Sequence, residues 1–215
     1  MSDFGLITMI EQQVKNNKRY NLYINEKYAF SVHEDILIAH QLYKGKEIDN
    51  NYYYELMQAE EKNKLWQKAL RYLSIKSRST YEVQQYLTRK GFEEGLIREV
   101  LSSLQEKQFL NDELYSEQFI NARNTHNPKG KKLLAYELKR KGINSSTISS
   151  SLLDFDEEKE LELAKELVNK KNGRNLKDDD WAKTKAKLAR YLERRGFSYH
   201  TISKALEDIQ ETEND

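Results

Sequence analysis

The stretch Leu87-Thr88-Arg89-Lys90-Gly91 predicts the end of a helix, because glycine readily takes the left-handed backbone conformation that closes one. The same pattern of leucine, any residue, two basic residues and glycine returns at Leu138–Gly142 and at Leu192–Gly196. In each copy, apolar residues lie 8 and 4 positions before the glycine and 1, 6 and 10 positions after it. Five coincident positions in three places predict an internal repeat.

Each copy predicts a helical hairpin with a third helix ahead of it. The leading helices are expected to end near Ser74 and to span residues 112–124 and 156–171. Ser79-Thr80-Tyr81-Glu82 has the form of a capping box, in which the serine and glutamate side chains accept hydrogen bonds from free amides at a helix start. Caps are also expected at Asn111 or Asp112 and at Asp154 or Asp156.

The N-terminal segment differs from the repeats. Its short β-favouring runs, residues 6–10, 19–24 and 28–32, predict a small antiparallel meander. A short helix is expected at residues 35–42, and the break at Lys44-Gly45-Lys46 precedes a longer helix that begins near Asp49.

The predicted fold class is therefore mainly α: tandem three-helix repeats that form an elongated curved body, with a small β-rich N-terminal segment. A compact bundle is the structural alternative. The expected domains are residues 1–50, a meander plus a short helix; 51–106, repeat 1; 107–153, repeat 2; and 154–215, repeat 3 with an acidic tail. Lys170–Asn175 has almost no apolar residue and is expected to be the loosest connection.

Composition supports this fold and restricts the location. Charged residues make up 33% of the 215 residues, with one proline and eight glycines, and this balance favours long solvated helices. The chain has no cysteine, which excludes disulfides and thiolate chemistry and suits a reducing cytoplasm. No signal peptide or apolar run of membrane-spanning length is present, so we expect a cytoplasmic protein without a membrane partner. We also expect the chain to be a monomer.

The sequence predicts no enzyme, cofactor or metal site. It lacks a nucleophile elbow, a phosphate-binding glycine loop and a zinc-protease helix. His33-Glu34-Asp35 groups possible ligands, but a turn or helix cap is the favoured interpretation. Acidic runs such as Asp156–Glu160, which mix with lysine, are interpreted as solvated helix faces, and Asp178-Asp179-Asp180 suits a helix start.

Charge is unevenly distributed along the chain. Residues 62–153 hold 17 Lys or Arg against 9 Asp or Glu, whereas residues 154–215 hold 13 against 16. The middle of the chain could attract phosphates or an acidic protein surface, and the acidic end from Glu207 is expected to be solvated or frayed.

Twelve basic residues are the candidates for binding a partner or DNA. Those before the glycines also suit the negative carboxy-terminal end of a helix, whereas those at predicted helix starts are not favoured there by the helix dipole. The first group is Arg89, Lys90, Lys139, Arg140, Lys141, Arg194 and Arg195, and the second is Lys76, Arg78, Lys129, Lys131 and Lys132. Tyr86 and Tyr191 share one repeat position, where packing is favoured over stacking on a base.

Several motifs, in their order and spacing, resemble the RecX family, the regulators of the RecA recombinase. They are Ala69-Leu70-Arg71-Tyr72-Leu73 with Arg78-Ser79, Leu87–Phe92, Phe109-Leu110-Asn111-Asp112 and Lys129-Gly130. The resemblance covers residues 62–210, and Tyr28–Asp35 is similar to the extension of longer members. The net negative last third departs from a uniformly basic binding face.

The resemblance implies a non-catalytic helical-repeat protein that lies in the groove of the RecA nucleoprotein filament. There it would inhibit polymerisation, ATP hydrolysis and strand exchange, and so modulate recombination and DNA repair. One alternative is a protein that binds single- or double-stranded DNA directly and without sequence preference, and another is a scaffold for an unrelated acidic partner.

Overall fold

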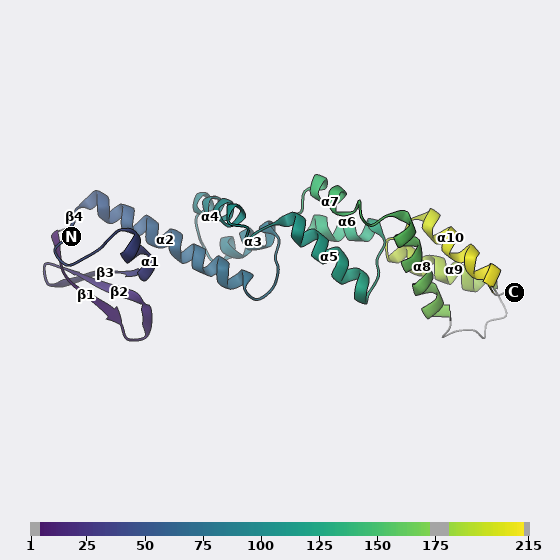
Figure 1. Ribbon diagram of the computed structural model, residues 1–215, viewed down its shortest axis with the longest axis horizontal. Helices are drawn as coiled ribbons and strands as arrows, with labels where there is room; N and C mark the ends of the chain where they lie inside the picture. The colour runs from purple at the N-terminus through teal and green to yellow at the C-terminus, as the bar shows by residue number, and fades with distance from the viewer. Residues whose placement is uncertain (1–4, 173–180, 213–215) are drawn as a thin grey trace. The chain divides into compact units, whose positions relative to one another are not determined.

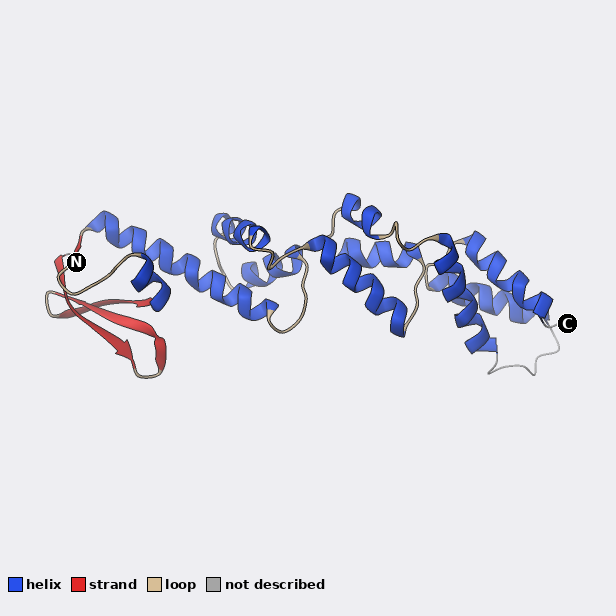
Figure 2. Ribbon diagram, viewed as in Figure 1, coloured by secondary structure: helices blue, strands red, loops and turns tan. Residues whose placement is uncertain are grey.

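The structure, a computed structural model, describes residues 5–172 and 181–212, and strands occur only in its N-terminal part (Figure 1, Figure 2). The strands are β1 (Gly5–Gln13), β2 (Asn16–Ile24), β3 (Lys27–His33) and β4 (Glu47–Ile48). The helices are α1 (Glu34–Ala39), α2 (Asn50–Leu73), α3 (Thr80–Arg89), α4 (Glu94–Glu106), α5 (Asp112–His126), α6 (Lys131–Arg140), α7 (Ser145–Ser151), α8 (Glu157–Asn172), α9 (Trp181–Arg194) and α10 (Tyr199–Thr212). The predicted class, mainly α with a β-rich start, is confirmed.

The chain forms two compact units. The first consists of Met1–Lys76 and Gln84–Phe109, and the second of Ser77–Val83 and Leu110–Asp215. The first turn of α3 thus belongs to the second unit, and the rest of this helix to the first. The predicted domain limits at residues 50, 106 and 153 stay predictions.

The N-terminal sheet is antiparallel, with strand order β3-β2-β1-β4. The first three strands are the predicted meander, and the two-residue β4 at its edge is too short to leave a sequence pattern. Leu22, Ile24 and Val32 face inward and share a core with Leu56 of α2. The N-terminal segment is therefore built onto the helix that leads the first repeat.

The predicted limits of α2 are confirmed. Its N-cap is Asp49, whose side chain accepts a hydrogen bond from the amide of Tyr52, and its C-cap is Ser74. The break before it contains Gly45, which has a positive φ of 100°.

One buried carboxylate connects the sheet to α2. Glu60 is 2% exposed, and its two oxygens accept hydrogen bonds from the Arg19 guanidinium at 2.7 Å and from the backbone amide of His33 at 2.8 Å. Arg19 also donates to the backbone carbonyl of Ser31 at 3.1 Å, so β2, β3 and α2 meet at this pair. The surrounding apolar periodicity does not predict a buried acid at residue 60.

The repeat pattern predicts the helical cores. Thirteen of its fifteen apolar positions are buried, and the remaining two, Phe92 and Leu152, are half-buried. Gly91, Gly142 and Gly196 end their helices with φ of 82°, 78° and 83°. We call each of these glycine turns, which ends the middle helix of a repeat, a corner. The left-handed glycine at all three corners confirms the predicted helix ends.

Three predicted features lie at or beyond the ends of the described residues. α8 continues to Asn172, and the rest of the expected connection lies outside the described residues, as does the acidic run at 178–180. α10 continues to Thr212, so the acidic end begins within a helix. None of the described helices is both long and apolar enough to cross a membrane.

Replacing Glu60 by glutamine is expected to lower the free energy of unfolding by roughly 3 kcal/mol, because it leaves Arg19 without a carboxylate and turns an amide toward the His33 N–H. Urea unfolding followed by circular dichroism measures this. Glu61→Gln is the matched control, since Glu61 is the exposed neighbour on the same helix. Equal losses in the two variants would show that the buried pair does not stabilise the unit.

Candidate functional site

The twelve predicted binding residues differ in exposure. The exposed ones are Lys76, Arg89, Lys90, Lys132, Lys139, Arg140 and Arg194. The half-buried ones are Arg78, Lys129, Lys131, Lys141 and Arg195. The first group is accessible from solvent, whereas several members of the second contact other parts of the chain.

Within the second unit, the start of α3 contacts the corner at the end of α6. The Ser79 hydroxyl donates to the backbone carbonyl of Lys141 at 2.6 Å, and the Lys141 ammonium donates to Oε1 of Glu82 at 2.6 Å. The amide of Thr80 donates to Asp112 Oδ1 at 2.8 Å. Ser79 and Glu82 also exchange the two hydrogen bonds of the predicted capping box, which is confirmed.

The start of α6 contacts the corner at the end of α9 in the same way. The amide of Gly130 donates to the carbonyl of Arg195 at 2.9 Å, and the amide of Lys131 donates to Glu160 Oε1 at 2.8 Å. The Arg195 guanidinium donates to the carbonyl of Pro128 at 3.1 Å.

These two contacts are equivalent by repeat position. Ser79 and Gly130 each lie 12 residues before the glycine of their own repeat, and the accepting carbonyls belong to Lys141 and Arg195, each one residue before its glycine. We call this contact, between the start of one middle helix and the glycine corner of the following repeat, the helix joint. A carboxylate from the following repeat supplies the hydrogen-bond acceptor for the helix start in both copies.

The helix joint requires glycine for space as well as for conformation. A β-carbon at Gly142 would lie 2.2 Å from Cβ of Tyr81, and one at Gly196 would lie 2.4 Å from the backbone nitrogen of Leu133. At Gly91, by contrast, a β-carbon would meet no described atom within 4 Å beyond the adjacent residues. The first corner is therefore not closed by a helix joint.

The carboxyl group of Glu82 is the charged centre of the first joint. Burial alone would raise its pKa, but hydrogen bonds from the Lys141 ammonium, the Ser79 amide and the Tyr115 hydroxyl together lower the pKa below its ordinary value of 4.5. Burial and the negative charge of Glu82 raise the pKa of Tyr115 to about 12. Tyr115 is therefore a neutral donor, and Glu82 an ionised acceptor, at neutral pH.

Intramolecular partners explain several of the half-buried cations. Lys141 and Arg195 complete the two joints, and Lys129 forms an ion pair with Glu137. One prediction is wrong: Glu160, assigned to a solvated face, is 3% exposed and accepts hydrogen bonds from Lys131 and Thr201. Its neighbour Asp156 caps α8 by accepting from the amide of Lys159, as predicted.

A cation lies over a tyrosine ring four residues earlier at every corner. Centroid distances are 5.6 Å for Lys90 over Tyr86, 5.9 Å for Arg140 over Tyr136 and 4.7 Å for Arg195 over Tyr191. Tyr86 also stacks on Tyr72, with ring centroids 4.0 Å apart. These contacts support the packing interpretation of Tyr86 and Tyr191.

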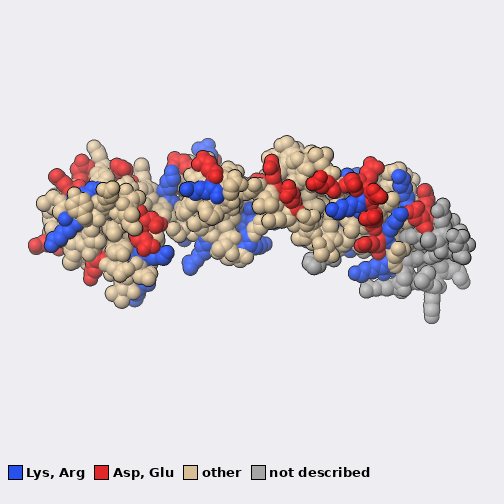
Figure 3. Space-filling model, viewed as in Figure 1, with Lys and Arg blue, Asp and Glu red and all other residues tan. Residues whose placement is uncertain are grey.

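Acidic and basic side chains are interspersed on the face drawn in Figure 3, in the first unit as well as in the second. This face is not a uniformly basic surface.

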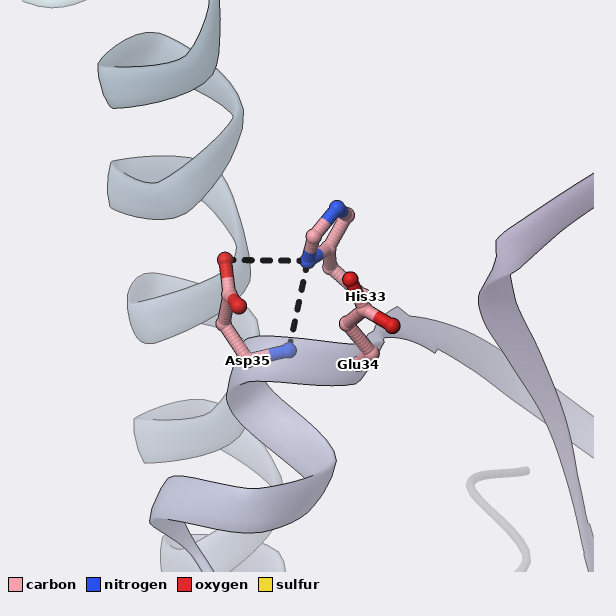
Figure 4. A group of neighbouring side chains, drawn as sticks. All are labelled: His33, Glu34 and Asp35. Carbon is pink, nitrogen blue, oxygen red and sulfur yellow. Dashed lines mark hydrogen bonds and ion pairs between the residues drawn. The ribbon is translucent and has the colours of Figure 1, made fainter.

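His33, Glu34 and Asp35 lie together at the start of α1 (Figure 4). His33 is the N-cap: its Nδ1 accepts a hydrogen bond from the amide of Asp35 and lies 3.1 Å from Asp35 Oδ2. The predicted capping role is confirmed, and these contacts explain the cluster without an ion.

Four family models match successive parts of the chain. They describe the RecX regulatory protein N-terminal domain at residues 5–49 and its first, second and third three-helix domains at residues 66–104, 111–152 and 157–206. The three predicted three-helix repeats are thus confirmed.

The chain is also similar to individual proteins that are named regulatory protein RecX. The chain is 37% identical to Regulatory protein RecX of Bacillus subtilis strain 168 over 212 residues, which cover 97% of this chain and 78% of that one. It is also 37% identical to Regulatory protein RecX of Halalkalibacterium halodurans, over 95% of this chain and 78% of that one. A crystal structure of regulatory protein RecX matches with a TM-score of 0.81 and 29% identity, covering 95% of this chain and 99% of that one.

Alanine at the three corner glycines tests the helix joint. Gly91→Ala is expected to lower the free energy of unfolding by roughly 1 kcal/mol, the cost of a left-handed alanine. Gly142→Ala and Gly196→Ala are expected to lower it by roughly a further 1 to 3 kcal/mol, because the added methyl group must displace Tyr81 or Leu133. Thermal and urea unfolding measure the series. Equal losses at all three positions would mean that backbone conformation alone selects glycine.

The lowered pKa of Glu82 predicts a pH-dependent contribution to stability. Because its folded pKa is depressed, the contribution is fully present above the unfolded value of 4.5 and is lost as the pH falls through the lower folded value. The difference in unfolding free energy between the wild-type protein and Glu82→Gln should be largest at neutral pH and shrink below 4.5. Glu162→Gln, at an exposed position of α8, is the control. A difference that persists unchanged in acid would contradict the role of the charge.

Proposed function

This chain belongs to the RecX family of regulatory proteins, and we propose that it regulates the RecA recombinase by binding the RecA nucleoprotein filament. In this proposal it inhibits polymerisation of the filament, and with it ATP hydrolysis and strand exchange. The observation that carries the proposal is the match of all four domains of the family along one chain.

The exposed basic residues support a filament as the partner. A RecA filament presents DNA phosphates and protein carboxylates in a repeating array, and spaced cations on helical repeats complement such an array. We propose the twelve predicted cations as the binding set, with the exposed Lys139, Arg140 and Arg194 at its centre. Lys141 and Arg195 would act by holding the corners in place.

A regulator of this kind needs no catalytic site of its own. We propose that the chain is not an enzyme, that it works as a monomer, and that it acts in the cytoplasm, where RecA meets DNA. Direct binding of DNA by the corner cations is the second candidate function. Its supporting observation is the tyrosine ring under each corner cation, which holds the charge near the helix surface.

DNA-dependent ATP hydrolysis by RecA should fall when the chain is added in stoichiometric amounts. The double variant Lys139→Glu with Arg140→Glu should restore most of the hydrolysis, because both side chains are exposed and both lie outside the helix joints. Lys159→Glu with Lys204→Glu is the control, since it reverses two exposed charges of the same unit. Coupled spectrophotometric ATPase assays measure each protein.

Unchanged ATP hydrolysis in the presence of the wild-type chain would reject the proposal. Equal restoration by both double variants would reject the corner residues as the site. Binding of each protein to DNA without RecA separates the two candidate functions, since only direct DNA binding predicts a loss in that assay.

A further inference from the structure

The first unit contains an open groove of about 680 Å³ between the sheet, α2 and the end of α3. Six of its lining residues are cations, namely Lys18, Arg19, Lys64, Lys68, Arg71 and Lys90. None of the described residues that line it is acidic. Such a concentration of one charge attracts an anion from solution.

Three of these cations have a role in the fold. Arg19 binds the buried carboxylate of Glu60 at 2.7 Å, and Lys64 lies 3.7 Å from the same group. Lys18 pairs with Glu34 at 3.4 Å. Stability within the unit accounts for their presence.

The other three have no carboxylate partner among the described residues: Lys68 and Arg71 on α2, and Lys90 at the end of α3. Lys64, Lys68 and Arg71 follow each other at helical spacings of four and three residues, so they share one face of α2. Like charges at these spacings destabilise a helix by roughly 0.2 to 0.5 kcal/mol per pair. The contact with Glu60 accounts for Lys64, but no contact within the described part of the fold accounts for Lys68 and Arg71.

Lys90 differs from its counterparts in the other repeats. Lys141 and Arg195 occupy the same position, one residue before the corner glycine, and both are held in helix joints. The corner at Gly91 has no joint, and Lys90 lines the groove instead. The repeated cation is thus structural in two copies and available to a ligand in the first.

The residues that line the groove favour a phosphodiester backbone over an acidic protein segment as the ligand. An acidic protein segment would need apolar pockets for anchor side chains, but the groove offers mainly Leu70 and Tyr86, and Tyr86 is already stacked on Tyr72. A phosphodiester backbone needs only spaced cations.

We propose that this groove binds the sugar-phosphate backbone of a nucleic-acid strand, with Lys68, Arg71 and Lys90 as its principal phosphate contacts. The site lies in the first unit. It includes Lys90, one of the twelve predicted cations, and none of the corner residues of the second unit. It does not depend on RecA as a partner, since the strand binds the chain alone.

Fluorescence anisotropy of a labelled oligothymidylate, titrated with the full chain over a range of salt concentrations and without other proteins, tests the site. The triple variant Lys68→Ala, Arg71→Ala and Lys90→Ala should bind more weakly, and its slope of log affinity against log salt should fall by about 2, since each lost phosphate contact removes ~0.7. The matched control is Lys15→Ala, Lys27→Ala and Lys44→Ala, three exposed cations of the same unit that do not line the groove. Thermal unfolding verifies that both variants are folded.

A reduced slope in the groove variant with an unchanged slope in the control supports the proposal. Equal slopes in the wild-type and groove variants, or equal losses in both triple variants, overturn it. Polyglutamate is added as a competitor, and displacement of the oligothymidylate at lower charge concentration than unlabelled oligothymidylate requires would overturn it in favour of an acidic protein ligand.

Discussion

The helical part of the second unit depends on the close approach of a helix start to a glycine corner. Glycine ends the middle helix in a left-handed turn, and the absence of a β-carbon lets another helix start approach to contact distance. The carbonyl just before the glycine, which the helix end leaves without a partner, then accepts a hydrogen bond from that start. Glycine thus serves two purposes: it ends one helix, and it leaves room for another helix start to pack against that end.

Buried and half-buried carboxylates supply further hydrogen-bond acceptors at the helix starts. Each helix start leaves amides without acceptors, and in the joints Asp112 and Glu160 reach from the following repeat to supply them. Glu60 does the same for the amide of His33 at the start of α1. These acids explain why basic residues such as Lys131 can occupy helix starts, where the dipole would otherwise disfavour them.

Local signals in the sequence predicted most of the fold. The apolar spacing, the capping box at Ser79 and the corner glycines act over a few residues, so the helices and their limits could be located without tertiary information. The burial of Glu60 and Glu160 could not be predicted, because their partners lie 41 and 29 residues away. The same limit applies to the candidate site: cations are visible in the sequence, but whether Lys141 faces a partner or Glu82 depends on residues that meet only in the folded chain.

The three copies of the corner motif therefore make different contacts, although they share one sequence pattern. In the second and third copies the last cation contacts the chain itself, since a helix start occupies the space beside the glycine. What precedes the first copy is a sheet built on α2, and this leaves Gly91 without a joint and Lys90 beside a row of like charges. The same motif thus forms a helix joint in the second and third repeats and lines a groove in the first, without any change in the motif itself.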